Sequence, residues 1–168
     1  MADGTAGQPR MRPEKVEAFL KQPTVAVLVG LTASGEPMAT PIWYRYEDGR
    51  FLMHTAYETA KSRAIERSDR VCLCIQDPRP PHRYVTVRGQ AKVIRDKERA
   101  LELQEQLACA YLGPIGGRFY LRNVASAYSG EDVIIEVTPT RTLTLDGNEL
   151  LNPVMMAAFR ALRKVPGL

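Results

Sequence analysis

Two side chains near the middle of the chain, Thr55 and Lys61, could together bind a phosphate group. Thr55 ends a short run of β-forming residues, and Lys61 follows six positions later, in the first turn of a helix that Thr59 opens. The N-terminus of a helix presents unpaired N–H groups and a partial positive charge, so anions bind there readily. A hydroxyl and an ammonium group at this point therefore indicate a phosphate-binding site.

Basic residues are concentrated in the segment 61–99, which holds eleven Lys or Arg residues against five Asp or Glu residues. This local excess fits an anionic ligand, but a solvated surface or a nucleic acid would fit it as well. The position of Lys61 at the helix start favours a ligand. Arg63 stays open between ligand and solvent, and Arg67 is typical of a surface residue. Because no recognition motif supports nucleic-acid binding, we expect a small-molecule partner instead.

The sequence shows no set of residues typical of acid–base, nucleophilic or metal-assisted catalysis. His54 and His82 are the only histidines, and no Cys or His spacing resembles a metal site, so we interpret both as structural or surface residues. Cys72 and Cys74 are most simply core residues. We see no Ser-His-Asp set, carboxylate pair or Cys-His dyad. This pattern suits a protein whose chemistry belongs to a bound cofactor.

The candidate phosphate site follows a predicted β-hairpin. One strand is expected from Met38 to Tyr46 and the other from Arg50 to Thr55, joined by the Asp48-Gly49 turn. Asp-Gly between two runs of aromatic and β-branched residues is a strong hairpin signal, because Gly supplies the positive φ that the turn needs. Pro41 cannot donate to a ladder, so the first strand should be an edge or a bulge there, or lie beside a ligand or a second subunit.

The other elements are predicted from apolar periodicity and from capping residues. In chain order they are a helix at 13–21, strands at 24–32, 71–75 and 83–94, a helix at 97–111 capped by Asp96, a loop at 113–117, a helical or irregular segment at 118–128, a last strand or strand pair at 133–145 and a C-terminal helix from Pro153. About six strands, with helices only between or after them, favour a closed or half-closed antiparallel barrel over a doubly wound parallel sheet.

The 168 residues are enough for one domain with a substantial core. We expect a flexible tail at 1–12 and a single domain at 13–168. The tail lacks the apolar core of a signal peptide, and no run of about eighteen apolar residues occurs. The three cysteines are an odd number, which favours a reducing compartment over a disulfide framework. The expected location is therefore the cytoplasm, with no membrane partner.

Four segments, by their order and spacing, resemble the split β-barrel flavin and deazaflavin oxidoreductases related to pyridoxamine 5′-phosphate oxidase. They are GEPMATPIWY at 35–44, DGRFLMHT at 48–55, AKSRAIERSDRVCLC at 60–74 and RYVTVRGQA at 83–91. The resemblance covers Thr24 to Val93 well and the remainder more loosely. It implies a mainly β fold: a split antiparallel β-barrel of about six strands in Greek-key order, with flanking helices.

The resemblance also implies a homodimer that holds its cofactor in a groove between the two barrels. The phosphate-binding Thr and Lys of the family match Thr55 and Lys61. Independently of the resemblance, Arg45 and Arg83 are candidate partners for an anionic tail. Trp43 is either a core or interface aromatic or part of the cofactor site. The resemblance identifies no catalytic residue. The full candidate cofactor-binding set is Met38, Thr40, Pro41, Ile42, Trp43, Arg45, Thr55, Lys61, Arg63 and Tyr84.

Three departures argue against oxidation of pyridoxamine phosphate. Pyridoxamine 5′-phosphate oxidase has an Arg-Lys pair where this chain has Ala60-Lys61, a Lys where it has Tyr44 and a Gln where it has Tyr84. The Thr-Pro-Ile-Trp and Arg-Tyr-Val strands resemble instead the branch that uses the deazaflavin coenzyme F420. The expected function is therefore hydride transfer between F420 and a small organic substrate. FMN in place of F420, and a non-catalytic protein that carries a flavin or a haem, are the alternatives.

Overall fold

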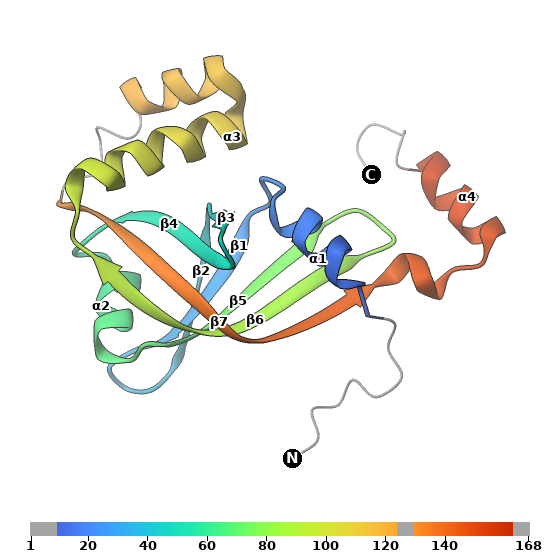
Figure 1. The fold of residues 1–168 in the computed structure, drawn as a ribbon, viewed down its shortest axis with the longest axis horizontal. Coiled ribbons are helices and arrows are strands. Elements are labelled where there is room, and N and C mark those ends of the chain that lie inside the picture. The colour runs from blue at the N-terminus through green and yellow to red at the C-terminus, as the bar shows by residue number, and fades with distance from the viewer. Residues whose placement is uncertain (1–9, 124–129, 163–168) are drawn as a thin grey trace.

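The computed structural model describes residues 10–123 and 130–162, so most of the expected N-terminal tail and the end of the segment 118–128 lie outside it. The elements are α1 (Pro13–Leu20), β1 (Ala26–Leu31), β2 (Pro37–Ile42), β3 (Arg45–Glu47), β4 (Arg50–Ala56), α2 (Ala60–Arg67), β5 (Arg70–Asp77), β6 (Arg83–Ile94), α3 (Lys97–Asn123), β7 (Asp132–Asp146), the 3₁₀ turn η2 (Gly147–Leu150) and α4 (Pro153–Leu162). The strands form one antiparallel sheet in the order β2-β1-β5-β6-β7-β4-β3 (Figure 1). The predicted mainly β, antiparallel architecture is confirmed.

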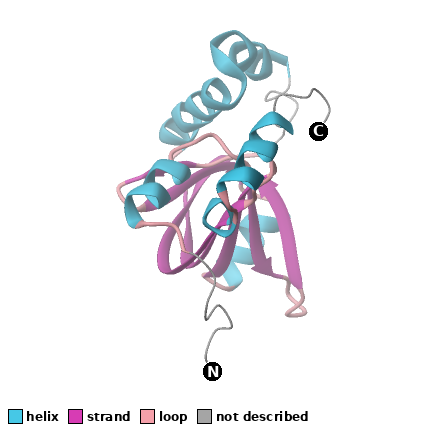
Figure 2. Ribbon diagram, turned by 90° about the vertical axis from the view of Figure 1, so that its right-hand side faces the viewer, coloured by secondary structure: helices cyan, strands magenta, loops and turns pink. Residues whose placement is uncertain are grey.

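The sheet curls round without closing into a complete barrel. Its two edges, β2 and β3, are consecutive in the chain, and only Trp43 and Tyr44 separate them. Two residues span a few ångströms, so the edges must come close to each other although they form no ladder. Figure 2, turned by 90° from Figure 1, shows the strands wrapped in this way with helices outside them. This gap is the split of the barrel that the sequence predicted.

The prediction of one continuous strand from Met38 to Tyr46 was wrong, because the chain leaves one sheet edge and joins the other inside that segment. At the break, the Tyr44 N–H donates to the Tyr111 hydroxyl at 3.1 Å instead of to a strand. The sheet consequently has seven strands rather than about six. The edge position predicted from Pro41 is confirmed, since β2 pairs with β1 alone.

The Asp48-Gly49 turn is confirmed between β3 and β4. Asp48 has a φ of 49° and Gly49 a φ of 74°, so both central residues adopt the positive φ of a type I′ hairpin turn. The hairpin ladder is short, running from Arg45 opposite Leu52 to Glu47 opposite Arg50. Beyond it, β4 pairs with β7, and this second ladder positions the end of β4.

The apolar residues form two clusters, one inside the curled sheet and one outside it. Inside, Val85 and Val87 of β6 are fully buried, and Phe19 of α1 closes one end. Outside, Leu103 and Leu107 of α3 pack with Ile134 of β7. Because the outer cluster fixes α3 against β4 and β7, the underside of this helix covers the end of β4.

The segment 113–117 was predicted to be a loop, and the structure corrects this to a sharp break inside α3. Gly113 has φ 73° and ψ 169°, and Pro114 begins a second helical arm that folds back on the first (Figure 1). A Cβ on Gly117 would lie 2.8 Å from the backbone nitrogen of Cys109, so Gly allows the two arms to pack closely. Neither α3 nor any other described helix combines the length and apolar character needed to cross a membrane.

Candidate functional site

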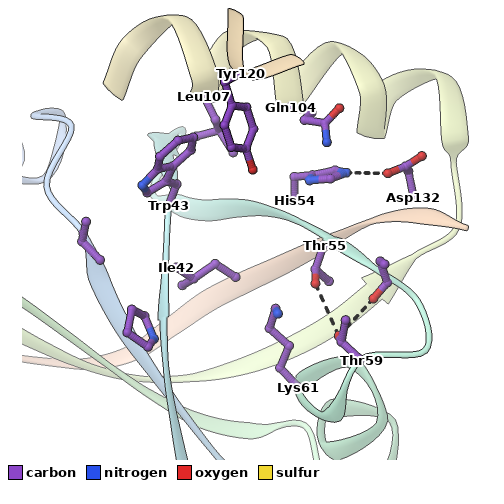
Figure 3. A pocket seen from close by; sticks show the side chains of 13 residues that line it. Ile42, Trp43, His54, Thr55, Thr59, Lys61, Gln104, Leu107, Tyr120 and Asp132 are labelled. Carbon is purple, nitrogen blue, oxygen red and sulfur yellow. Dashed lines mark hydrogen bonds and ion pairs between the residues drawn. The ribbon is translucent and has the colours of Figure 1, made fainter. Parts of the chain in front are cut away.

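A cavity of about 390 Å³ lies where β2 ends, between β4, the start of α2 and the underside of α3 (Figure 3). Its walls come from segments that are far apart in the sequence. They are Val25, Pro41, Ile42, Trp43, His54, Thr55, Ala56, Thr59, Lys61, Gln104, Leu107, Tyr120 and Asp132. A cavity of this size suits a small organic molecule, and its polar groups gather at two ends.

The end of the cavity next to α2 is formed by Thr55, Thr59 and Lys61. Thr59 caps the helix, since its Oγ1 accepts a hydrogen bond from the Ser62 N–H at 3.4 Å. The same oxygen lies 3.3 Å from Oγ1 of Thr55. Figure 3 shows the Lys61 side chain rising from α2 into the cavity beside these two residues. Two hydroxyl groups and one ammonium group therefore meet at a helix N-terminus.

Lys61 is half-buried, and burial lowers the pKa of its ammonium group from the usual value. Within residues 10–123 and 130–162, its ammonium group forms no hydrogen bond or ion pair. A desolvated cation without a partner is unfavourable, and a bound anion would remove that cost. The donors present fit a phosphate group, because an ammonium group, hydroxyls and helix N–H groups all favour anionic oxygens.

At the other end of the cavity, under α3, His54 of β4 and Asp132 of β7 form a pair. His54 Nε2 lies 2.8 Å from Asp132 Oδ1, and the two side chains are 15% and 25% exposed. In the ladder, His54 lies opposite Ile134 and Ala56 lies opposite Asp132. The pair thus occupies diagonal positions on one face of the sheet. Figure 3 shows Gln104 of α3 above the His54 ring.

An aromatic cluster forms the wall of the cavity at the split. The Trp43 ring stacks on the Tyr111 ring, with a centroid separation of 4.9 Å and an interplanar angle of 15°. It also meets the Tyr120 ring at 5.3 Å in a tilted arrangement. Tyr111 and Tyr120 lie on the two arms of α3, so the break at Gly113 brings both rings to Trp43. Trp43 therefore packs against helix residues and also lines the cavity.

Residues 12–146 match the family model described as pyridoxamine 5′-phosphate oxidase, which is most of the chain. The chain belongs to the pyridoxamine 5′-phosphate oxidase family. This confirms the family that the four segments predicted. A search of the curated proteins gave no match.

Several solved structures share the fold of this member of the pyridoxamine 5′-phosphate oxidase family. A conserved hypothetical protein of Mycobacterium tuberculosis is 21% identical with a TM-score of 0.72, over 88% of this chain and 92% of that one. An F420 reductase is 24% identical with a TM-score of 0.60, over 76% and 94%. A FAD-binding protein of Mesorhizobium loti is 14% identical with a TM-score of 0.59, over 81% and 95%. At these identities the likeness establishes the fold.

The structure brings half of the predicted cofactor-binding residues together and leaves the other half apart. Those that line the cavity are Pro41, Ile42, Trp43, Thr55 and Lys61. Those outside its walls are Met38, Thr40, Arg45, Arg63 and Tyr84. Met38 and Thr40 lie further from the split on β2, and Arg63 is exposed on α2. Tyr84 lies on β6, between Gln76 of β5 and Leu145 of β7.

The two arginines predicted to meet an anionic tail are already paired within the chain. Arg45 lies 2.5 Å from Glu47 and also donates to Gln106. Arg83 donates to Asp77 at 2.9 Å. Burial opposes ionisation of Asp77, but the hydrogen bonds from Arg83 and Arg79 hold the pKa of this carboxyl below its usual value. Lys61, in contrast, has its charge directed into the cavity.

His54, Asp132, Gln104, Thr59 and Tyr120 line the cavity but were missing from the sequence-based set. Thr59 is the residue predicted to open the helix, and its position four residues after Thr55 and two before Lys61 was a usable signal. The His54–Asp132 pair had no such signal, because its members are 78 positions apart and only the β4–β7 register joins them. No group of three or more His, Cys, Asp or Glu side chains in the described ranges could hold a metal ion.

Proposed function

We propose that this member of the pyridoxamine 5′-phosphate oxidase family is an oxidoreductase that uses coenzyme F420. It would transfer a hydride between the cofactor and a small organic substrate. The observation that carries the proposal is Lys61, a half-buried ammonium group without a partner among the described residues, which faces a cavity at a helix N-terminus. Such a group is matched by the phosphate that F420 and flavin nucleotides have in common.

The proposed division of roles follows two parts of the cavity, the end next to α2 and the wall at the split. Lys61 and Thr55 would hold the phosphate group, and Thr59, whose hydroxyl donates to the Ala56 carbonyl at 3.0 Å, caps the helix beside them. Pro41 and Trp43 would flank the ring system, because both line the cavity beside the sheet edge. When bound, the cofactor supplies the ring that gives or takes the hydride. The chain binds and orients it and keeps water from the reacting atoms.

F420 is preferred over FMN on two grounds. The Thr40–Trp43 and Arg83–Val85 strands resemble the F420-dependent branch of the family. In addition, one structure with the same fold is an F420 reductase. A FAD-binding protein also shares the fold, so a flavin is the alternative that any test must include.

We further propose that two copies of the chain associate and that the second copy completes the cofactor groove. The cavity is open on one side, where Val25 of its wall is 45% exposed. A ring system held in a single open cavity would stay in contact with water. A second chain across the opening would exclude that water, as hydride transfer requires.

An absorbance spectrum of the purified protein, followed by fluorescence titrations with F420 and with FMN, tests the choice of cofactor. We expect a colourless protein that binds F420 saturably and more tightly than FMN. If the protein is purified yellow with bound FMN, FMN is its cofactor in place of F420. Turnover with reduced cofactor and a panel of acceptors then tests catalysis, and saturable binding without any turnover would indicate a carrier.

A further inference from the structure

The His54–Asp132 pair is a second polar site in the cavity, separate from the phosphate-binding end. His54 Nε2 lies 2.8 Å from the Asp132 carboxylate, which has no other ion-pair partner among the described residues. The pair lies beneath α3, whose Gln104 and Leu107 also line this end. Figure 3 shows the pair across the cavity from Lys61. A ligand held at Lys61 and extending along the cavity would approach His54.

Asp132 determines which nitrogen of His54 carries hydrogen. A carboxylate oxygen only accepts hydrogen bonds, so His54 Nε2 must donate and keep its hydrogen in both protonation states. Nδ1 is the nitrogen left for another partner, and no residue in the described ranges bonds to it. Nδ1 carries a lone pair in the neutral ring and an N–H in the imidazolium form, so this one atom can release or take up a proton.

We propose that His54 is the proton donor of the reaction and that Asp132 positions it. The inference rests on the proposed function, because the proton accompanies the hydride transfer proposed above. Hydride adds to the carbon end of a polar or conjugated double bond in the substrate, the π bond breaks, and its electron pair moves to an oxygen atom. That oxygen takes the proton from His54 Nδ1. The substrate gains two electrons and two hydrogens, and the neutral imidazole is reprotonated from water.

The charges around His54 come from three elements. Asp132 of β7 bonds to it directly, and Lys61 of α2 contributes a positive charge to the same cavity. From α3, Gln104 is neutral and Tyr120 is a phenol. An oxyanion formed near His54 would therefore meet an imidazolium N–H and would also be attracted by the Lys61 ammonium group in the same cavity. The substrate class that fits this end is a compound whose oxygen becomes anionic on reduction.

His54→Gln is the variant that separates proton donation from structure. Gln places an amide nitrogen near the position of His54 Nε2, so the bond to Asp132 is retained, but Gln has no proton to release. His82→Gln is the matched control, since His82 is exposed and lies outside the cavity. Because the chain has only two histidines, the control variant also leaves His54 as the single imidazole signal in ¹⁵N NMR spectra.

The first measurement is ¹⁵N NMR of the His54 ring in His82→Gln across the titration of the imidazole. We expect the neutral ring to carry its hydrogen on Nε2. When Asp132→Ala is added to this background, the hydrogen should be shared between the two nitrogens. If Asp132 only filled space, its removal would leave the hydrogen on the same nitrogen. A neutral ring with its hydrogen on Nδ1 would overturn the proposal.

The second measurement is binding of 2,4-dinitrophenolate, an oxyanion that stays ionised over the range studied, to the protein saturated with the cofactor that it binds. We expect binding that weakens as the pH rises through the NMR-determined titration of His54. His54→Gln should bind at least about tenfold more weakly and without this pH dependence, as for a lost charge-assisted hydrogen bond. Equal binding by His54→Gln, or no binding by the unaltered protein, would contradict the proposal.

Failure of the inference and failure of the proposed function give different results. If no cofactor binds, the same comparison is made in the Lys61→Met background without cofactor, where the ammonium group cannot hold the probe. If adding His54→Gln to Lys61→Met weakens the binding of 2,4-dinitrophenolate in a pH-dependent way, the His54 assignment is kept and the cofactor assignment is removed. If F420 binds but His54→Gln does not change the binding of 2,4-dinitrophenolate, the cofactor assignment is kept and the His54 assignment is removed.

Discussion

At the scale of single residues, the half-buried charge of Lys61 favours binding of an anionic ligand and lowers the stability of the cofactor-free fold. Burial lowers the pKa of its ammonium group, so the charged form is disfavoured in the folded state. Below the folded-state pKa, Lys61 is charged in both states and folding includes the cost of desolvation. Above that pKa, the unfolded chain binds more protons, so this group makes stability rise with pH toward the usual value of 10.5.

Lys61→Met should therefore raise the melting temperature of the cofactor-free protein at neutral pH. The gain should shrink as the pH is raised toward about 10, because the folded wild-type side chain then loses its charge. Thermal unfolding followed by circular dichroism at several pH values measures this. A lower melting temperature at neutral pH would show that the ammonium group has a stabilising partner.

Tyr44 has a buried hydroxyl group with no hydrogen-bond partner among the described residues. Burial also raises the pKa of this phenol. Tyr44→Phe removes the unsatisfied group and keeps the ring contact with Phe51 at 5.4 Å. We expect the free energy of unfolding to increase by about 1 kcal/mol, measured by urea denaturation. Tyr46→Phe, in a half-buried ring that also contacts Phe51, is the control and should change little.

The residue scale also shows what sequence alone could predict about the site. Lys61 and Thr55 were identified because strand end, cap and helix start are adjacent in the chain. His54 was interpreted as structural or surface, although it immediately precedes Thr55. Its role depends on Asp132, and that partner is set by the pairing of β4 with β7 rather than by spacing along the chain.

At the scale of elements, Tyr111 holds the split between β2 and β3. Its hydroxyl accepts a hydrogen bond from the Tyr44 N–H at 3.1 Å, and lies 3.0 Å from the Thr24 carbonyl and 3.2 Å from the Tyr44 carbonyl, to one of which it donates. Tyr111→Phe leaves the Tyr44 N–H unsatisfied at the place where the ladder is interrupted. The backbone there needs this partner because neither sheet edge supplies one.

We expect Tyr111→Phe to lower the free energy of unfolding by about 1–3 kcal/mol, the usual cost of an unsatisfied buried donor. Trp43 stacks on Tyr111 and is the only tryptophan, so its fluorescence reports directly on the split. Tyr57→Phe is a matched control, since the Tyr57 hydroxyl bonds to the exposed Glu66. Equal stability of Tyr111→Phe and the unaltered protein would mean that the split is held by packing alone.

The elements that sequence predicted well are those determined locally. The Asp48-Gly49 turn and the Asp96 cap, whose Oδ1 accepts from the Arg99 N–H at 3.1 Å, need only residues within a few positions. The break between β2 and β3 was missed because it depends on the two sheet edges meeting. The loop predicted at 113–117 was wrong, because Pro114 starts a second helical arm that tertiary packing stabilises.

At the scale of the whole molecule, the proposed dimer follows from the open cavity. Large apolar side chains are also exposed on the second arm of α3, where Ile115 is 84% and Phe119 65% exposed. We expect light scattering after size-exclusion chromatography to give twice the mass of one chain at micromolar concentration. The mass of a single chain would mean that the cofactor site is completed within one protomer.

The central claim is that Lys61 binds the phosphate group of a redox cofactor, and a fluorescence titration with F420 tests it most directly. We expect Lys61→Ala to bind F420 more weakly by about 1.5–3 kcal/mol, roughly 10- to 150-fold, as for a lost charge-assisted hydrogen bond. Arg67→Ala removes an exposed cation from the last turn of the same helix and should bind like the unaltered protein. Equal affinities of Lys61→Ala and the unaltered protein would contradict the claim.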